Sequence, residues 1–329
     1  MMRTPILSRR HILAGGSAAA IAGAFSVSPG ARAKTSATIN QVPAFYRFRV
    51  GDISAIAISD GPLALGKPAD TIKAPDGEVN KALAENFLPA DAWDIAQNAL
   101  AIINNGRVAL FDTGMGASTV FGDRAGKLLT NLKAAGIEPG DVDDVILTHA
   151  HADHCWGLVA TDRKSNFPNA TIHIAQSDFD FWTDESKASI NDIMKLMVNG
   201  TRAQLLPVRD RVAYIRVGQE VVPGVTAMAA PGHTVGHTVF MISSGGKALC
   251  NVADIVHHYV LSMEKPRFEF AFDTDPKQGV DTRLRLLDML ATDRIEFLAY
   301  HFPWPGIGHV AKRGDAFHYL ATPMNLAQP

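Results

Sequence analysis

Four potential metal ligands lie within six residues, in the segment His149-Ala150-His151-Ala152-Asp153-His154. Imidazole and carboxylate groups are the usual protein ligands of zinc and similar ions. In an extended segment alternate side chains point the same way, so His149 and His151 can bind one ion together. Asp153 and His154 follow where the chain must turn, and they can face a second ion. The segment therefore predicts a two-metal site of the kind that hydrolases use.

Three more potential ligands lie far apart in the sequence: His233, Asp254 and His301. A single histidine is more often a structural residue than a ligand, so each of them alone is weak evidence. Asp254 and His301, like His149 and Asp112, follow apolar runs typical of strands, and His233 lies in a glycine-containing loop. Strand ends from different parts of a sheet converge on one edge, where α/β folds usually place their ligands. The sequence thus predicts one site assembled from five separated segments.

Hydrophobic patterning predicts an α/β chain. Strands are expected at 46–60 (two, turning at Gly51-Asp52), 100–103, 108–111, 144–148, 170–175, 212–217, 225–229, 238–243, 247–253 and 295–300. Asn105-Gly106 indicates a hairpin, because these residues tolerate positive φ. One helix is expected from Asp123 to Ala135. A second should begin at Asp275-Pro276, with aspartate as cap and proline in the first turn, and run to about Ala291. Residues 67–97 are expected to form a long irregular connection.

The overall composition fits an ordinary globular enzyme. The chain has 329 residues, is 47% hydrophobic and carries a formal net charge of −2. This apolar fraction is sufficient for a substantial core. The charges are nearly balanced and form no basic block, so neither nucleic acid nor an anionic membrane is an expected partner.

The first 33 residues resemble an export signal. Arg9-Arg10 precedes a mildly apolar stretch over 12–27, and Ala31-Arg32-Ala33 offers a small-x-small cleavage site. These features indicate a twin-arginine signal over 1–33 and a periplasmic or secreted location, an ordinary disordered N-terminus or an uncleaved anchor being the alternatives. Glycine and serine interrupt the apolar stretch, so no stable membrane insertion is expected after signal removal. Removing four of the 31 basic residues and no acid leaves 27 against 33, a net charge of −6.

The chain contains two cysteines, Cys155 and Cys250. They could pair in an oxidising periplasm, but twin-arginine export moves proteins that have already folded, with any metal ions already loaded. Cys155 directly follows His154, and Cys250 lies on a predicted strand. We therefore expect two buried free thiols in place of a disulfide.

Taken in order, the motifs Thr148-His149-Ala150-His151-Ala152-Asp153-His154, Gly232-His233, Asp254 and His301 resemble those of the metallo-β-lactamase superfamily. Asp112-Thr113-Gly114 is similar to the motif that precedes them in that family. The resemblance covers nearly the whole mature chain. It implies an α/β fold of four layers, the αββα metallo-β-lactamase sandwich, as a single domain over residues 34–329.

The resemblance also implies a role for each ligand. One ion would be held by His149, His151 and His233, and the other by Asp153, His154 and His301. Asp254 would bridge the two ions and orient the attacking hydroxide, while Asp112 and His237 would support the ligands. His257, His258 and His309 lie close in sequence to ligands and are expected to be supporting or structural residues, not ligands. In this superfamily a bridging aspartate is typical of lactonases, thioester hydrolases and phosphoesterases, and it is not used by true class B β-lactamases.

A closer likeness is to the methyl parathion hydrolase group, whose relatives include aryl-lactone and aryl-ester hydrolases. It rests on four motifs: Tyr46-Arg47-Phe48-Arg49-Val50-Gly51-Asp52, Ser59-Asp60-Gly61, Phe179-Asp180-Phe181-Trp182 and Phe302-Pro303-Trp304-Pro305-Gly306-Ile307-Gly308-His309. Ala152 departs from the pattern, because that group often has proline there. An apolar pocket for an aryl group is expected to be walled by aromatic residues that follow ligand-bearing segments, namely Phe121, Phe179, Phe181 and Trp182, ordinary core packing being the alternative. The likeness to this group favours Trp182 among them.

The favoured function is that of a binuclear hydrolase in which a metal-bridging hydroxide cleaves lactones or aryl esters, with phosphotriesterase activity beside it. A dedicated organophosphate hydrolase would use the same ligands and differ only in pocket shape. An iron-dependent oxidoreductase or a metal-binding protein is the third interpretation. The expected cofactors are two divalent ions, with zinc first and manganese, iron and cobalt left open. The expected partner is a small-molecule substrate, and a homodimer is left open.

Overall fold

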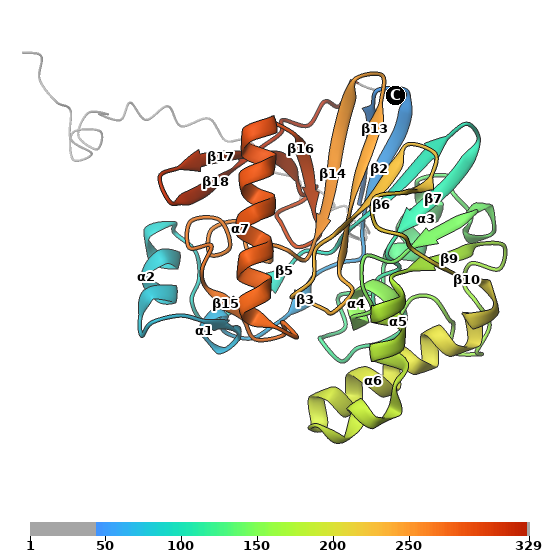
Figure 1. The fold of residues 1–329 in the computed structure, drawn as a ribbon, viewed down its shortest axis with the longest axis horizontal. Coiled ribbons are helices and arrows are strands. Elements are labelled where there is room, and N and C mark those ends of the chain that lie inside the picture. The colour runs from blue at the N-terminus through green and yellow to red at the C-terminus, as the bar shows by residue number, and fades with distance from the viewer. Residues whose placement is uncertain (1–43, 328–329) are drawn as a thin grey trace, which may run out of the picture. The chain divides into compact units, whose positions relative to one another are not determined.

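A first mixed sheet forms one half of the fold in the computed structural model, which describes residues 44–327 (Figure 1). Its seven strands, in spatial order, are β1 (Phe45–Val50), β2 (Ile53–Ser59), β6 (Asn98–Asn104), β7 (Arg107–Phe111), β8 (Asp144–Ile146), β9 (Thr171–Ile174) and β10 (Val212–Tyr214). The predicted export signal lies outside the described residues. The predicted hairpins at Gly51-Asp52 and Asn105-Gly106 are confirmed.

A second sheet of seven strands follows in the chain. Its strands, in spatial order, are β11 (Glu220–Val222), β12 (Val225–Ala229), β13 (Thr238–Ser244), β14 (Lys247–Ala253), β16 (Glu296–Ala299), β17 (Ile307–Arg313) and β18 (Ala316–Ala321). The β1–β2 turn packs against the end of the β13–β14 hairpin, where a Cβ on Gly51 would lie 2.1 Å from the carbonyl oxygen of Ser244. Gly51 also has φ +58, so both space and backbone conformation require glycine there.

The two sheets face one another across a shared apolar core. Phe111 from the first sheet and Phe240 from the second are fully buried, and their ring centroids lie 5.4 Å apart. Leu100 and Ile146 from the first sheet and Leu249 and Leu298 from the second belong to the same cluster. Alternate residues of β1, β2, β6, β7, β12 and β13 belong to this layer, as the pleat of a strand requires.

Helices cover the outer face of each sheet, which completes the four layers of the predicted αββα sandwich (Figure 1). On the first sheet lie α3 (Leu128–Ala134), α4 (Ala152–Cys155), α5 (Gln176–Thr183) and α6 (Asp192–Leu205), with the 3-10 turns η2 (Pro139–Asp141), η3 (Glu185–Ser189) and η4 (Leu206–Arg211). On the second lies α7 (Pro276–Asp293), which packs through Leu286, Leu287 and Leu290. The Asp275 side chain caps α7 by accepting a hydrogen bond from the amide of Gln278, as predicted.

Two local predictions are wrong. Residues 67–97 are not irregular throughout, because they contain two helices, α1 (Pro68–Thr71) and α2 (Glu78–Glu85). They also contain two short strands: β4 (Ile72–Lys73) pairs with β15 (Glu269–Phe270), and β5 (Asp94–Ile95) pairs with β3 (Leu63–Ala64). Helix α3 begins at Leu128 and not at Asp123. Gly126 has φ +75, outside the helical region, and its amide and that of Leu128 donate hydrogen bonds to the buried Asp60 carboxylate.

Both cysteines are buried and free, as predicted. Burial raises the pKa of Cys250 to about 12 and moves the pKa of Cys155 even further above its usual value. Among residues 44–327 no helix is both long and apolar enough to cross a membrane.

We expect neither thiol to react with a chromogenic disulfide reagent in the folded protein, because the thiolate is the reactive form and burial suppresses it. After unfolding in denaturant without reductant, two thiols per chain should react. No reaction after unfolding would reveal a disulfide, and fast reaction before unfolding would contradict the burial of both side chains.

Candidate metal centre

The central histidine-rich segment is held in place by Asp112, the residue directly after β7. Asp112 has φ +61, an uncommon backbone conformation for aspartate, and its side chain is buried. Its carboxylate accepts hydrogen bonds from the amide of Thr148 at 2.8 Å and lies 2.9 Å from Nδ1 of His154. Asp112 therefore fixes both the start of the segment and the orientation of a predicted ligand, as expected from the sequence.

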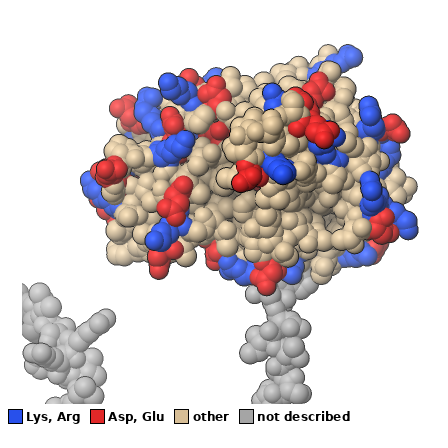
Figure 2. Space-filling model, turned by 90° about the horizontal axis from the view of Figure 1, so that it is seen from below, with Lys and Arg blue, Asp and Glu red and all other residues tan. Residues whose placement is uncertain are grey.

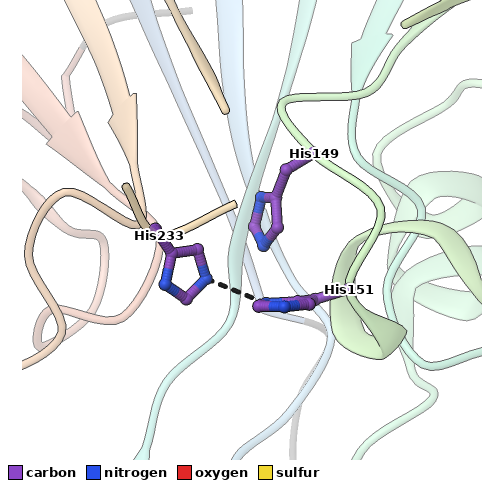
Figure 3. Close-up of side chains that lie close together, drawn as sticks. All are labelled: His149, His151 and His233. Atoms are coloured by element: carbon purple, nitrogen blue, oxygen red, sulfur yellow. Dashed lines mark hydrogen bonds between the residues drawn. The ribbon is translucent and has the colours of Figure 1, made fainter. Parts of the chain in front are cut away.

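The first predicted trio of ligands comes together from two loops (Figure 3). His149 and His151 follow β8, and His233 lies between β12 and β13. The facing nitrogens of His151 and His233 lie 2.9 Å apart, and the ring of His149 has its centroid 4.7 Å from each of the other two. One nitrogen of each ring lies within 4.8 Å of the others, so a single ion could contact all three.

The second predicted trio lies beside the first. Asp153 and His154 belong to α4, and His301 follows β16. Oδ2 of Asp153 lies 3.4 Å from Nε2 of each of the two histidines. Nδ1 of His301 lies 2.8 Å from the carbonyl oxygen of Ala96, which leaves Nε2 facing the site.

Asp254, directly after β14, lies between the two trios. Its Oδ2 is 3.3 Å from Nε2 of His233 and 3.1 Å from Nε2 of His301, one ligand from each trio. Its Oδ1 is 3.3 Å from Nε2 of His154. His237, the other predicted supporting residue, accepts a hydrogen bond at Nε2 from the amide of Asp254 at 3.1 Å. The carboxylate is thus placed where it could contact two ions.

The donor atoms at the centre fit a pair of cations. Nε2 of His149, Nε2 of His154 and Oδ1 of Asp254 are buried and have no hydrogen-bond partner. A buried polar group without a partner costs about 1–3 kcal/mol, and three of them converge on one point. Bound cations would satisfy all three, and imidazole with carboxylate is a donor set that suits zinc and its neighbours.

Electrostatics within the cluster prepare His149, His151 and Asp254 for cations, whereas Asp254 and Asp273 outweigh burial and raise the pKa of His233 to about 9, so a cation must displace a proton from that ring. Burial lowers the pKa of His149 and of His151 well below the usual range, so both rings are neutral and can offer a lone pair. Burial alone would raise the pKa of Asp254, but His301 and His154 outweigh it and hold the pKa well below the usual range. The carboxylate is therefore ionised, as a bridging ligand must be.

Three more buried side chains lie at the centre, and the sequence does not reveal the roles of two of them, Asp273 and Asp178. Oδ1 of Asp273 lies 2.8 Å from Nδ1 of His233, and Asp178 accepts backbone hydrogen bonds from both histidine loops. Nε2 of His257 lies 3.4 Å from Oδ2 of Asp254, as close as several predicted ligands. The only sequence signals are that Asp178 precedes the aromatic run 179–182 and that Asp273 follows alternating phenylalanines.

A cavity of about 490 Å³ opens above the centre. His151, Asp153, His233, Asp254 and His301 lie at its base. Its walls are largely apolar and include Phe121, Phe181, Trp182, Met194, Met197 and Phe270. The prediction that Phe179 lines the cavity is wrong. Its side chain is buried away from the cavity and packs against Tyr214, with ring centroids 5.8 Å apart. On the face seen in Figure 2, charges of both signs are interspersed around a broad uncharged middle region.

The fold and the site define a four-layer αββα protein with a buried two-ion donor set at one edge of its sheets. Residues 92–302 match the family described as the Metallo-beta-lactamase superfamily, and the chain belongs to that superfamily. The resemblance noted from the motifs is thereby confirmed at the level of the superfamily. The closer likeness to the methyl parathion hydrolase group stays a prediction.

Similar proteins of known structure include two that the chain covers almost completely. AidC, a dizinc quorum-quenching lactonase solved with a product, is 29% identical with a TM-score of 0.79, over 86% of this chain and 99% of AidC. AbOPH, a hydrolase in the beta lactamase superfamily, is 28% identical with a TM-score of 0.80, over 87% and 100%. An N-acyl homoserine lactonase of Bacillus cereus is 28% identical over 160 residues, 49% of this chain. The chain spans about half the length of that curated relative, 53%.

Replacing Asp273 with asparagine should weaken zinc binding about 10–100-fold, the usual effect of losing a ligand's supporting partner. Asparagine cannot hold the His233 ring as a carboxylate does, so the tautomer that presents Nε2 to the ion is no longer favoured. Zinc affinity can be measured by competition with a chelator. The matched control is Asp281→Asn on α7, where the side chain is exposed. Equal affinities in Asp273→Asn and the control would contradict this role.

Proposed function

We propose that this chain is a dinuclear zinc hydrolase that cleaves lactones. The observation that carries the proposal is the Asp254 carboxylate, which lies between two trios of ligands at the base of a largely apolar cavity. The dizinc lactonase AidC, at 29% identity and over 99% of its own length, supports both zinc and lactones. Lactonase activity, zinc and the ligand roles of individual residues are our proposals for this chain.

Two divalent ions at this centre would lower the pKa of water toward neutrality and polarise the carbonyl group that is attacked. The residues of the chain supply the geometry for this chemistry. The two trios would hold the ions, and Asp254, which lies between them, would contact both ions and help to orient the attacking group. Asp112 and Asp273 hold His154 and His233 in fixed orientations, so little reorganisation is needed during the reaction.

The cavity favours a substrate with an apolar or aromatic body. Trp182 is 2% exposed and lies edge-on to His151, with ring centroids 5.1 Å apart. Phe121, Phe181, Phe270 and the methionines of α6 provide the rest of an apolar wall around a polar base. An aryl or acyl group packed against this wall would place its ester carbonyl over the ligand cluster.

Organophosphate hydrolysis is the second candidate, because the sequence likeness to the methyl parathion hydrolase group extends to Phe181 and Trp182, which line the cavity. Attack at carbon and attack at phosphorus need the same ligands, so the shape of the pocket decides which substrate is preferred.

We also propose twin-arginine export of the folded protein, on the strength of Arg9-Arg10 and the cleavage motif at 31–33.

The direct test is the ratio of kcat/KM for an aryl lactone, dihydrocoumarin, to that for methyl parathion, measured on zinc-loaded protein. We expect a ratio far above one. A ratio far below one would make organophosphate hydrolysis the main activity and contradict the lactonase proposal. Inactivity on dihydrocoumarin and on an N-acyl homoserine lactone alike would also contradict it.

Replacing Trp182 with alanine should raise KM for the aryl lactone by about tenfold or more, since burying one large apolar side chain is worth roughly 1.5–3 kcal/mol. The turnover number should change less, because the ligand cluster is retained. Phe179→Ala is the matched control, on the same helix but away from the cavity. It should lower the melting temperature and leave KM unchanged. Equal KM values for the two variants would remove Trp182 from the substrate wall.

A further inference from the structure

A buried carboxylate on α5 joins the two loops that carry the first trio of histidines. Asp178 is fully buried, yet it is neither a predicted ligand nor part of the cavity wall. Its Oδ2 accepts a hydrogen bond from the amide of Ala150 at 2.8 Å, and Ala150 lies between His149 and His151. Its Oδ1 accepts one from the amide of Gly236 at 2.7 Å, in the loop that carries His233. Oδ2 therefore holds the His149–His151 loop, and Oδ1 holds the His233 loop.

The packing around Gly236 shows how closely this loop approaches α5. A Cβ at position 236 would lie 2.7 Å from the amide nitrogen of Asp178 and 2.6 Å from Oγ of Ser177. Distances below about 3 Å are not seen for real Cβ atoms, so only glycine allows this approach. The contact therefore depends on both residues. Gly236 has no side chain and so allows the close approach, and the Asp178 carboxylate accepts a hydrogen bond from its amide.

A second link joins the same loops and explains why the fold does not depend on Asp178 alone. The amide of Thr238 donates a hydrogen bond to the carbonyl oxygen of Thr148 at 2.9 Å, just outside the histidines. Loss of the carboxylate should therefore change the spacing of the histidine loops without separating the strands that carry them.

We propose that Asp178 is a positioning residue that sets the distance between the His149–His151 loop and the His233 loop, and so determines the affinity for the ion held by these three histidines. The second trio, Asp153, His154 and His301, has no hydrogen bond to Asp178. The effect should consequently be selective for one of the two ions. The inference rests on the proposed metal centre and is independent of which substrate is hydrolysed.

The test is Asp178→Asn, which keeps the size of the side chain but turns one acceptor into a donor facing a backbone N–H. The matched control is Asp180→Asn, an identical change two residues along α5 at an exposed position. Stepwise zinc affinities of the apoprotein are measured by chelator competition. We expect one of the two constants to weaken about 10–100-fold in Asp178→Asn, the other to stay within about threefold, and the control to match the wild type.

Hydrogen exchange of the wild-type apoprotein provides a test that needs no variant. The amides of Ala150 and Gly236 should exchange slowly, because each donates to a buried carboxylate, and both should exchange faster in Asp178→Asn. Gly236→Ala should weaken the same zinc constant from the opposite side of the contact. Unchanged zinc constants in Asp178→Asn, an equal loss at both sites, or fast exchange of both amides in the wild type would each overturn the proposal.

Discussion

The structure depends on one constraint: seven polar side chains that attract cations must be buried together at a single point. The cluster of His149, His154 and Asp254 at its centre contains three buried donor atoms without a hydrogen-bond partner. In a low-dielectric interior such groups are costly unless ions or hydrogen bonds satisfy them. The rest of the fold holds these groups rigidly in place, and its stability offsets the free-energy cost of burying them.

The sandwich provides that stability through its apolar layers, while unusual backbone conformations occur beside the ligands. Asp112 has φ +61 and Ala253, directly before Asp254, has φ +43. Such conformations are unfavourable for residues other than glycine and persist only where the surroundings enforce them. Asp112 follows β7 and Ala253 ends β14, two central strands whose apolar residues are buried. The strained positions thus aim two carboxylates at the centre from opposite sheets.

The sequence is sufficient to predict which candidate ligands lie together, because these residues are concentrated in short motifs at strand ends. His149, His151, Asp153 and His154 are adjacent, and strand ends bring His233, Asp254 and His301 to the same edge. Asp178 and Asp273 escape prediction because their roles arise from hydrogen bonds to residues 28 and 40 positions away. The prediction for Phe179 fails for a local reason. Successive residues of a helix point about 100° apart, so Phe179 and Trp182 on α5 need not both face the cavity. The start of α3 depends on Asp60, 68 residues before Leu128.

The central claim is that the two trios hold two ions with Asp254 between them. The most direct measurement is the anomalous scattering from crystals of zinc-loaded protein, collected on both sides of the zinc edge. We expect two peaks per chain, one among His149, His151 and His233 and one among Asp153, His154 and His301, each within bonding distance of an Asp254 oxygen. A single peak, or a peak bound by His257 and Asp273 in place of one trio, would contradict the claim.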